Sequence, residues 1–455
     1  MSGESTVHFM SKQIEVIADQ VLRWARAAGA DDAEVSVHES TEFSAGVRMG
    51  TVETLTEAAS RGLQLRVFVS QRMARAGTSD LRLETLEGLT QRAVERARLA
   101  NADPFAGLPE ETGVVPEVET LKLYDPALEE WSAAEKISLA QETERIGLNL
   151  DPRVNNSGGA NFHVGRSRVW LVNTRGFAAG YRSTGCSLSL HLLGQDGDQQ
   201  AQVSDYWFTA ARQRSELETP EEVARRTVER VRRHLGARKI ETQEVPVVFE
   251  PVLAAELLSD LFGAVTGNAI YLRRSFLVDQ LGKKIAAEGV TVIDDGLLPG
   301  RLGTRPFDRE GVASQRTVVI KNGVLRNYLC GAYSARKLKL RSTGNGTGNG
   351  ETPTNFYLAA GPHAPKEIIA TVKQGLYVTR LIGQGVNLVT GDYSRGAFGL
   401  WIENGELTYP VHEITISGNL RRMMEEMEMV GSDLEFRDQI AAPTVKVSSM
   451  SVAGK

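Results

Sequence analysis

Three glycine-containing dipeptides constrain the fold of this chain more than any other sequence feature. They are Asp196-Gly197, Asn322-Gly323 and Asn404-Gly405, and each lies between runs of strand-forming residues. Such pairs favour two-residue hairpin turns, because Gly, Asn and Asp adopt the positive φ angles that these turns need. The runs over 317–329 and 399–409 therefore predict tight hairpins, and the Asp-Gly pair predicts another in the first half. Antiparallel sheet is expected in both halves of the chain.

The first half alternates helical and strand-like patterns. Helices are predicted over 12–28, 86–100, 133–150 and 219–235. Strands are predicted over 34–37, 48–57, 62–77, 154–160, 163–173, 177–193 and 200–209, with turns at Gly158-Gly159 and Arg175-Gly176. The last helix has a capping signature, Thr219-Pro220-Glu221-Glu222. Residues 101–128 are acidic and proline-punctuated, which predicts a long surface loop across the domain.

A polar stretch over 236–245 separates this half from the rest, and we place the domain boundary there. The predicted domains are residues 1–240 and 241–455, in line with the two or three domains expected of 455 residues. In the second half a strand over 245–249 and a helix over 252–266 precede short strands, with further helices near 366–374 and 418–430. The expected fold class is α+β: a layered N-terminal domain on an antiparallel sheet, then a β-rich, barrel- or sandwich-like domain with peripheral helices.

Composition narrows the class of protein. The chain has 57 acidic and 52 basic residues, a net charge of −5 and 41% apolar residues. The interspersed charges argue against direct nucleic-acid binding, which needs clustered Lys and Arg. No run reaches the roughly 18 apolar residues of a membrane span, and no secretory signal pattern is present. Only two cysteines occur, Cys186 and Cys330, so a reducing cytoplasm is expected.

Motifs for metal binding or nucleophilic catalysis are not recognisable. None of the seven histidines has another within five residues, so the paired-histidine zinc pattern is missing. His412-Glu413 begins like such a motif, but a strand-like run follows it. There is no GxSxG elbow, and Cys330 lies in an apolar run that is typical of a core position. We therefore expect this chain to contribute no catalytic residue and no metal ligand.

Two glycine-rich segments are candidates for binding. Residues 344–350 do not end in the Gly-Lys-Ser or Gly-Lys-Thr of a phosphate loop, which favours a mobile loop over a binding cleft or interface. Residues 383–419 combine many glycines with Asp392 and Arg395 in a turn. Such a segment either lets an extended peptide add to a strand edge or simply makes tight turns, and the pattern alone leaves both open.

The second of these segments resembles the TldD/PmbA family, and within it the PmbA (TldE) branch. The matching residues are Gly385-Val386-Asn387, Thr390 through Ala397, Trp401 through Glu406, Tyr409-Pro410-Val411 and Glu413 through Leu420, with Thr304-Arg305-Pro306-Phe307-Asp308, Glu310-Gly311-Val312, Tyr333 through Leu338 and Met450 through Gly454 elsewhere. The resemblance extends over nearly the whole chain and is most specific in its C-terminal half.

The resemblance implies one subunit of a two-part zinc peptidase. A TldD-like subunit carries an HExxxH zinc motif on the helix that opens the C-terminal domain, and the PmbA-like subunit has the same fold without it. The pair encloses a chamber into which unfolded peptide is threaded. The family is linked to the maturation of peptide precursors and the degradation of small unfolded antitoxins, and its older name is modulator of DNA gyrase.

The corresponding helix here, 249–263, contains no His; Glu256 and Asp260 on it are expected to be solvated or at an interface. The resemblance thus implies no cofactor in this chain, with zinc in a TldD-like partner subunit, and an extended or unfolded peptide as substrate. The substrate-binding residues that we expect are Gly391, Asp392, Ser394, Arg395, Gly396 and His412.

Two other classes of function remain open from the sequence. One is a stand-alone homodimeric peptide-binding protein without catalysis, which an HExxxH paralogue in the same genome would argue against. The other is a self-sufficient metalloenzyme with scattered ligands such as His363, His412 and Glu413, which metal analysis of the isolated chain would decide.

Overall fold

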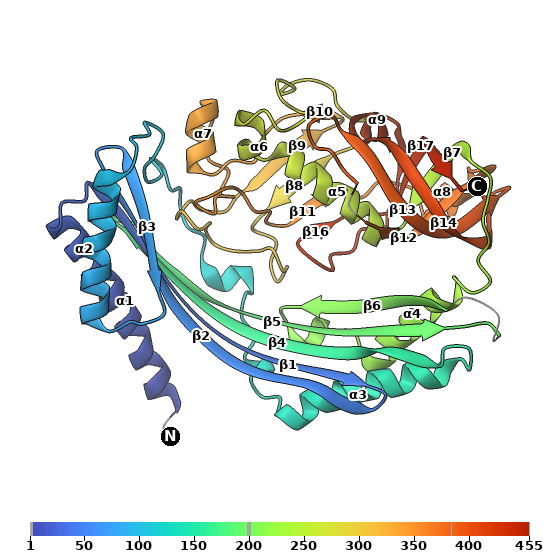
Figure 1. The fold of residues 1–455 in the computed structure, drawn as a ribbon, viewed down its shortest axis with the longest axis horizontal. Helices are drawn as coiled ribbons and strands as arrows, with labels where there is room; N and C mark the ends of the chain where they lie inside the picture. Colours follow the sequence, from blue (N-terminus) through green and yellow to red (C-terminus); the bar gives the residue numbers. More distant parts are fainter. Residues whose placement is uncertain (1–2, 198–201, 384, 455) are drawn as a thin grey trace.

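The computed structural model describes residues 3–197, 202–383 and 385–454, and Figure 1 shows two halves that lie one above the other. The first half is built on a six-stranded antiparallel sheet in the order β3-β2-β1-β4-β5-β6. Its strands are β1 (Asp32–Arg48), β2 (Thr51–Val69), β3 (Arg72–Thr78), β4 (Asn156–Asn173), β5 (Ala178–Gly194) and β6 (Val203–Ala211). Four of these strands have 17 to 19 residues, about three times the length of a typical strand.

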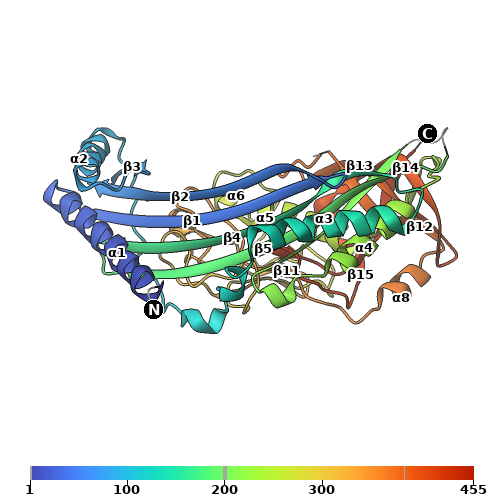
Figure 2. The ribbon, with the colours of Figure 1, turned by 90° about the horizontal axis from the view of Figure 1, so that it is seen from below.

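One face of this sheet is apolar and is covered by helices at both ends (Figure 2). At one end α1 (Gly3–Ala27) and α2 (Leu83–Leu99) pack on Val35, Val37 and neighbouring apolar side chains of β2. At the other end α3 (Ala133–Leu150) and α4 (Pro220–Arg232) pack on residues such as Phe162. Burial of these apolar faces drives the packing of helices on sheet.

The opposite face is polar and looks toward the C-terminal half (Figure 1). Ser60, Ser40, Ser167 and Ser183 lie side by side on four neighbouring strands. The Ser40 and Ser60 hydroxyl oxygens are 2.8 Å apart, as are those of Ser167 and Ser183. Because side chains alternate between faces along a strand, a polar face can accompany an apolar one on the same strands.

The second half contains a strand barrel and a smaller sheet. The barrel sheet has the order β14-β13-β12-β7-β17-β15, and pairing of β14 with β17 closes five strands into a ring. Its strands are β7 (Gln243–Phe249), β12 (Gln374–Ile382), β13 (Asp392–Glu403), β14 (Glu406–Asn419), β15 (Met427–Val430) and β17 (Val445–Ala453). The smaller sheet has the order β10-β9-β8-β11-β16, with β8 (Val292–Asp295), β9 (Arg316–Lys321), β10 (Val324–Leu325), β11 (Phe356–Leu358) and β16 (Ile440–Ala441).

Helix α5 (Pro251–Val265) follows β7 directly and packs between the barrel and the smaller sheet, with Leu253, Leu257 and Leu261 in the shared core. The second half also contains four shorter helices: α6 (Gly267–Tyr271), α7 (Ala332–Leu338), α8 (Pro365–Ala370) and α9 (Leu420–Glu425). None of the helices in the described ranges is long and apolar enough to cross a bilayer. The α+β class and the β-rich, barrel-like second half are confirmed.

The predicted elements are mostly confirmed, with errors at three turns and in the helix predicted near 418–430, which ends at Glu425 and is followed by strand β15. Both Asn-Gly hairpins form, with positive φ at Asn404 (50°) and Gly405 (83°) and at the corresponding pair 322–323. The predicted strands 48–57 and 62–77 were wrong, because each runs through a turn, at Met49-Gly50 and at Ser70-Gln71. The turn predicted at Gly158-Gly159 was wrong too, since β4 continues through it as a bulge. The Asp196-Gly197 pair lies between β5 and β6, which pair as predicted, although the turn extends beyond the described residues.

The 101–128 segment was expected to be a surface loop, but much of it lies against the C-terminal half. Leu108, Leu121 and Leu123 are buried. The Arg336 guanidinium donates to the carbonyls of Phe105 (2.8 Å), Gly107 (2.8 Å) and Leu108 (3.0 Å). The segment includes two short 3₁₀ turns, Val118–Leu121 and Pro126–Leu128. One guanidinium on α7 therefore binds three carbonyl groups of this segment and ties it to the C-terminal half.

We expect Arg336→Lys to loosen this segment, because a single ammonium group cannot reach three carbonyls as the planar guanidinium does. The lost hydrogen bonds should destabilise the segment by about 1–3 kcal/mol. A Glu-specific protease should then cut faster at Glu110, Glu111, Glu117 or Glu119. The exposed Arg341→Lys is the matched control. Equal cleavage of both variants and the wild type would contradict this assignment.

Candidate functional site

Two cavities lie between the polar face of the long sheet and the C-terminal half. The first, about 520 Å³, is named here the α5 cavity; among its lining residues are Tyr206, Trp207, Arg230, Glu250, Glu256, Ser259, Arg437 and Gln439. The second, about 790 Å³, is named the Arg66 cavity; among its lining residues are Glu34, Arg66, Arg75, Tyr181, Arg305, Asp308, Arg309, Asn349 and Gln439. Gln439 lines both, so the cavities adjoin. Both volumes are in the range of ligand-binding pockets.

The N-terminal end of α5 is held at the first cavity by buried ion pairs. Pro251 occupies the first helical position, where its missing N–H costs nothing. The preceding Glu250 carboxylate accepts hydrogen bonds from Arg230 (2.8 Å) and Arg233 (2.8 and 3.0 Å) of the α4 region. Because both guanidinium groups come from the first half, these bonds fix the start of α5 relative to the long sheet.

Further along α5, Glu256 and Asp260 are one turn apart, as expected. Arg395 of β13 donates to Glu256 (2.6 Å) and to the carbonyl of Gly383 (3.0 Å). Asp260 forms no ion pair with any of the described residues. One of its oxygens and the Tyr393 hydroxyl are buried without a hydrogen bond among the described residues. Burial, with the nearby Glu256 charge adding to it and Arg395 opposing it, raises the pKa of Asp260 to about 6.

The predicted substrate-binding residues fall into two groups. Gly391, Asp392, Ser394, Arg395 and Gly396 are all at the start of β13 or just before it. Asp392 and Ser394 are exposed, and Arg395 reaches α5. His412 lies apart from them on β14, where its backbone N–H contacts the carbonyl of Arg238 in the linker (3.4 Å). Of the predicted substrate-binding residues, Arg395 is therefore the one that contacts α5.

Strand addition at β13 is not supported by the structure, because the backbone of β13 is paired on both sides. One side pairs with β14 along its length. The other pairs with β12 from Gly396 onward and, before it, with 385–387 through bonds such as Ser394 N–H to Gly385 O (2.7 Å). A Cβ added to Gly385 would lie 1.7 Å from the Ser394 carbonyl oxygen. Only glycine therefore fits at this position. A ligand would contact these residues through their side chains.

The fold does not bring the candidate metal ligands His363, His412 and Glu413 together. In the described ranges, no three His, Cys, Asp or Glu side chains form a cluster that could hold a metal ion. His363 lies beside Gly431 and Ser432, whereas Glu413, next to His412, pairs with Lys239 (2.5 Å). Cys186 and Cys330 are both free and buried. Burial raises the pKa of the Cys330 thiol to about 12, in keeping with its predicted role as a core residue.

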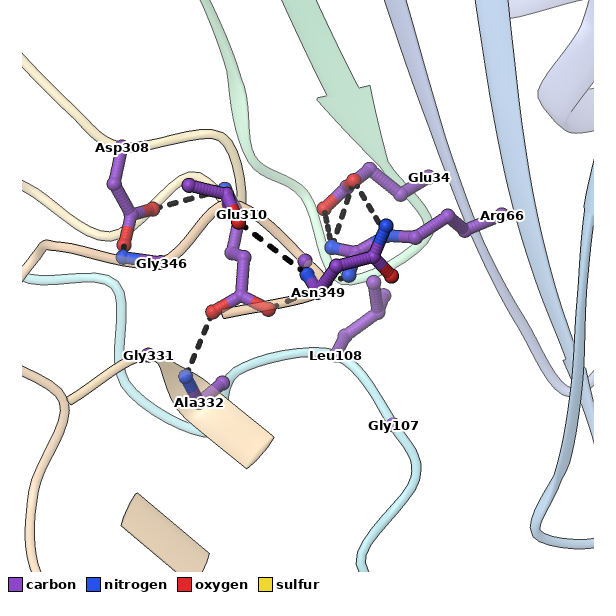
Figure 3. Close-up of polar contacts among 12 residues, drawn as sticks. Glu34, Arg66, Gly107, Leu108, Asp308, Glu310, Gly331, Ala332, Gly346 and Asn349 are labelled. Atoms are coloured by element: carbon purple, nitrogen blue, oxygen red, sulfur yellow. Dashed lines mark hydrogen bonds and ion pairs between the residues drawn. The ribbon is translucent and has the colours of Figure 1, made fainter. Parts of the chain in front are cut away.

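A buried acid–base cluster at the Arg66 cavity escaped the sequence analysis (Figure 3). Arg66 donates to both oxygens of Glu34 (2.9 and 2.8 Å) and to Glu310 (3.3 Å). Glu310 also accepts the Ala332 N–H (2.7 Å), and Asp308 accepts the Gly346 N–H (2.7 Å). Burial, with Glu310 adding to it, raises the pKa of Asp308 to about 7. The sequence carried little signal of this cluster, since Arg66 and Glu310 are 244 residues apart.

The glycine-rich segment 344–350 was expected to be a mobile loop over a cleft or interface; it borders this cavity, but it is tied to the surrounding protein. Thr347 and Asn349 line the cavity. Hydrogen bonds hold the segment in place: Asn345 is fully buried and donates to Asp294 (2.7 Å). A Cβ on Gly346 would lie 2.1 Å from Glu310, so only glycine allows Glu310 and Asp308 to approach it.

Comparison with known proteins places the whole chain in one group. Residues 33–98, 126–235 and 242–454 match three family models, described as domain 1, the central domain and the C-terminal domain of PmbA/TldA metallopeptidases. Metalloprotease PmbA of Escherichia coli O157:H7 is 36% identical over 452 residues, 99% of this chain and 98% of that protein.

Two crystal structures have the same fold. A protein of Bacteroides thetaiotaomicron described as a candidate modulator of DNA gyrase superposes with a TM-score of 0.89 at 27% identity, over 97% of this chain and 99% of that chain. TldE from Thermococcus kodakarensis superposes with a TM-score of 0.87 at 22% identity, over 96% of this chain and 100% of that chain.

The raised pKa of Asp260 predicts a pH-dependent contribution to stability. A carboxyl group whose pKa rises from 3.8 to about 6 on folding contributes stability that is fully present below pH 3.8 and is lost as the pH rises through about 6. Asp260→Asn should therefore reduce the loss of unfolding free energy between pH 5 and pH 8, measured by urea unfolding. Asp19→Asn, which removes an exposed carboxylate from α1, is the control. Equal pH dependence in Asp260→Asn and wild type would refute the assignment.

Proposed function

The chain belongs to the PmbA/TldA metallopeptidase family, and from this membership we propose that it is the PmbA/TldE-like subunit of a heteromeric zinc peptidase. It completes the chamber and holds extended substrate, while a TldD-like partner with an HExxxH helix supplies the zinc. The observation that carries the proposal is the absence of zinc-binding side chains on α5. In the TldD-like partner, the resemblance implies that the equivalent helix carries the zinc ligands.

The residues of α5 do not fit a zinc ion. Zinc sites in proteins use His and Cys far more than paired carboxylates. The segment from Phe249 to Gly263 has neither His nor Cys, and of its carboxylates Glu250 is paired with Arg230 and Arg233 and Glu256 with Arg395. In this chain the helix is thus a structural element that faces the cleft, and the proposal assigns the metal chemistry to the partner.

The cleft suits an extended polypeptide. The sheet face toward the C-terminal half is rich in serine and glycine, including the row Ser60, Ser40, Ser167 and Ser183. Small polar side chains leave room above the sheet and can hydrogen-bond a peptide backbone of any sequence. On the C-terminal half, Arg395 pairs with Glu256 of α5, which lines the first cavity and adds charged groups to this polar surrounding.

The subunit assignment is tested by cleavage assays on the chain alone and with an HExxxH-bearing paralogue from the same genome. We expect unfolded polypeptide to be cleaved by the complex only, and a zinc chelator to abolish that cleavage. Co-purification of the two chains should accompany the activity. Strong chelator-sensitive cleavage by this chain alone would refute the proposal.

Within that complex, Arg395→Gln should raise KM for unfolded polypeptide about tenfold, because a charge-assisted hydrogen bond contributes about 1.5–3 kcal/mol. Assembly, measured by size-exclusion chromatography, should be unchanged. Arg273→Gln removes an exposed guanidinium from the α6 end and serves as the control. An unchanged KM in Arg395→Gln would show that Arg395 does not hold substrate.

A further inference from the structure

The Arg66 cavity has an unusual balance of charge. Four guanidinium groups line it, those of Arg66, Arg75, Arg305 and Arg309, against two carboxylates, Glu34 and Asp308. A cavity with an excess of one charge attracts ligands of the opposite charge, and its low-dielectric walls strengthen the attraction.

Arg66 and the two carboxylates are already satisfied within the protein. Arg66 is held by Glu34 and Glu310 at 2.8 and 3.3 Å. Asp308 accepts backbone N–H groups from Glu310 and Val312 (both 2.9 Å) as well as from Gly346. Burial, with Glu310 adding to it, raises the pKa of Asp308, which weakens its tendency to carry a negative charge. Glu34 and Glu310 lie close enough to Arg75 to attract it, but among the described residues neither forms an ion pair with Arg75, Arg305 or Arg309.

The remaining guanidiniums contact no carboxylate in the described parts of the chain. Arg75 donates to the carbonyl of Gly348, and Arg305 donates to those of Pro353 (3.0 Å) and Thr352 (3.3 Å). The Nε atoms of Arg75 and Arg305 are buried without a hydrogen-bond partner among the described residues. Arg309 is exposed to the cavity. Unpartnered buried donors are costly, and an incoming acceptor would relieve that cost.

Tyr181 adds a neutral donor to the same wall. Its ring packs edge-on against Phe307 with centroids 5.4 Å apart. Burial raises the pKa of its hydroxyl, so the group stays protonated and able to donate, although Arg305 and Arg309 are close enough to oppose that shift. Two types of donor, guanidinium and phenol, thus converge on one polar cavity.

We propose that the Arg66 cavity is a carboxylate-binding subsite in which Arg75, Arg305, Arg309 and Tyr181 hold an acidic group of an extended peptide. This inference rests on the proposed function, which brings such a peptide into the cleft. The planar guanidinium group of arginine matches the geometry of a carboxylate and can bind it through two parallel hydrogen bonds. Gln439 lines both cavities, so a peptide held here lies next to the α5 cavity. The acidic group is either the C-terminal carboxylate or an Asp or Glu side chain.

The test uses the full chain and three 12-residue peptides of Gly, Ser and Ala that carry an uncharged dye at a blocked N-terminus. One has a free C-terminal carboxylate, one is amidated, and one is amidated with two internal Glu residues. Fluorescence anisotropy should show that the amidated neutral peptide binds at least about tenfold more weakly than one of the others, since a charge-assisted bond contributes more than 1.4 kcal/mol. Binding should weaken as salt rises. The stronger of the two acidic peptides identifies the source of the carboxylate.

Variants locate the site. Arg309→Gln and Arg75→Gln should each weaken binding of the acidic peptide about tenfold. Arg326→Gln, at an exposed position that lines neither cavity, should bind as the wild type does. Circular dichroism and melting temperature confirm that each variant is folded. Arg309→Gln decides the question if Arg75→Gln fails to fold, because Arg309 is exposed.

Equal binding of all three peptides, or unchanged binding in folded Arg309→Gln, would overturn the carboxylate subsite. If the complex still cleaves unfolded polypeptide in that case, the proposed function stands without it. If instead the acidic peptides bind as expected but no partner restores cleavage, the subsite stands and the proposed function fails.

Discussion

The long N-terminal sheet has one apolar and one polar face, and the arrangement of the rest of the molecule follows from that difference. Its strands are so long that two pairs of helices are needed to cover the apolar face, one pair at each end. The polar face cannot be buried in an apolar core, because each hydroxyl, amide and charge on it would need a partner. The C-terminal half therefore meets it across polar cavities and ion pairs rather than a continuous hydrophobic interface.

Buried charge pairs set how the two halves meet. Glu250 at the start of α5 is held by Arg230 and Arg233, and Arg66 of the sheet reaches Glu310 of the second half. A buried ion pair adds little net stability, since desolvation offsets much of the attraction, but loss of one partner leaves an uncompensated charge and is costly. These pairs thus favour one relative placement of the halves. That placement puts the α5 cavity and the Arg66 cavity next to each other, with Gln439 lining both.

Local signals predicted the elements well where the chemistry of one or two residues is decisive. The Asn-Gly turns form, and Thr219 caps α4 by accepting the Glu222 N–H (3.3 Å). The Ser70-Gln71 turn was missed because both residues take positive φ without the Gly or Asn that normally marks such a turn. Gly158-Gly159 was misassigned for the converse reason: the glycines accommodate a bulge and the close approach of His191, with no change of chain direction.

The sequence by itself determined the fold class, the order of most elements, the family and the lack of histidine on the helix that opens the second half. Those properties depend on residue identity and on spacing within a few tens of residues. Only the tertiary structure decided that β13 has no free edge, that Arg395 pairs with Glu256, and that Glu34, Arg66 and Glu310 form one cluster. Contacts between residues 139 or 244 positions apart leave no periodic pattern in the sequence. They arise only when distant segments pack together and their buried charges need partners.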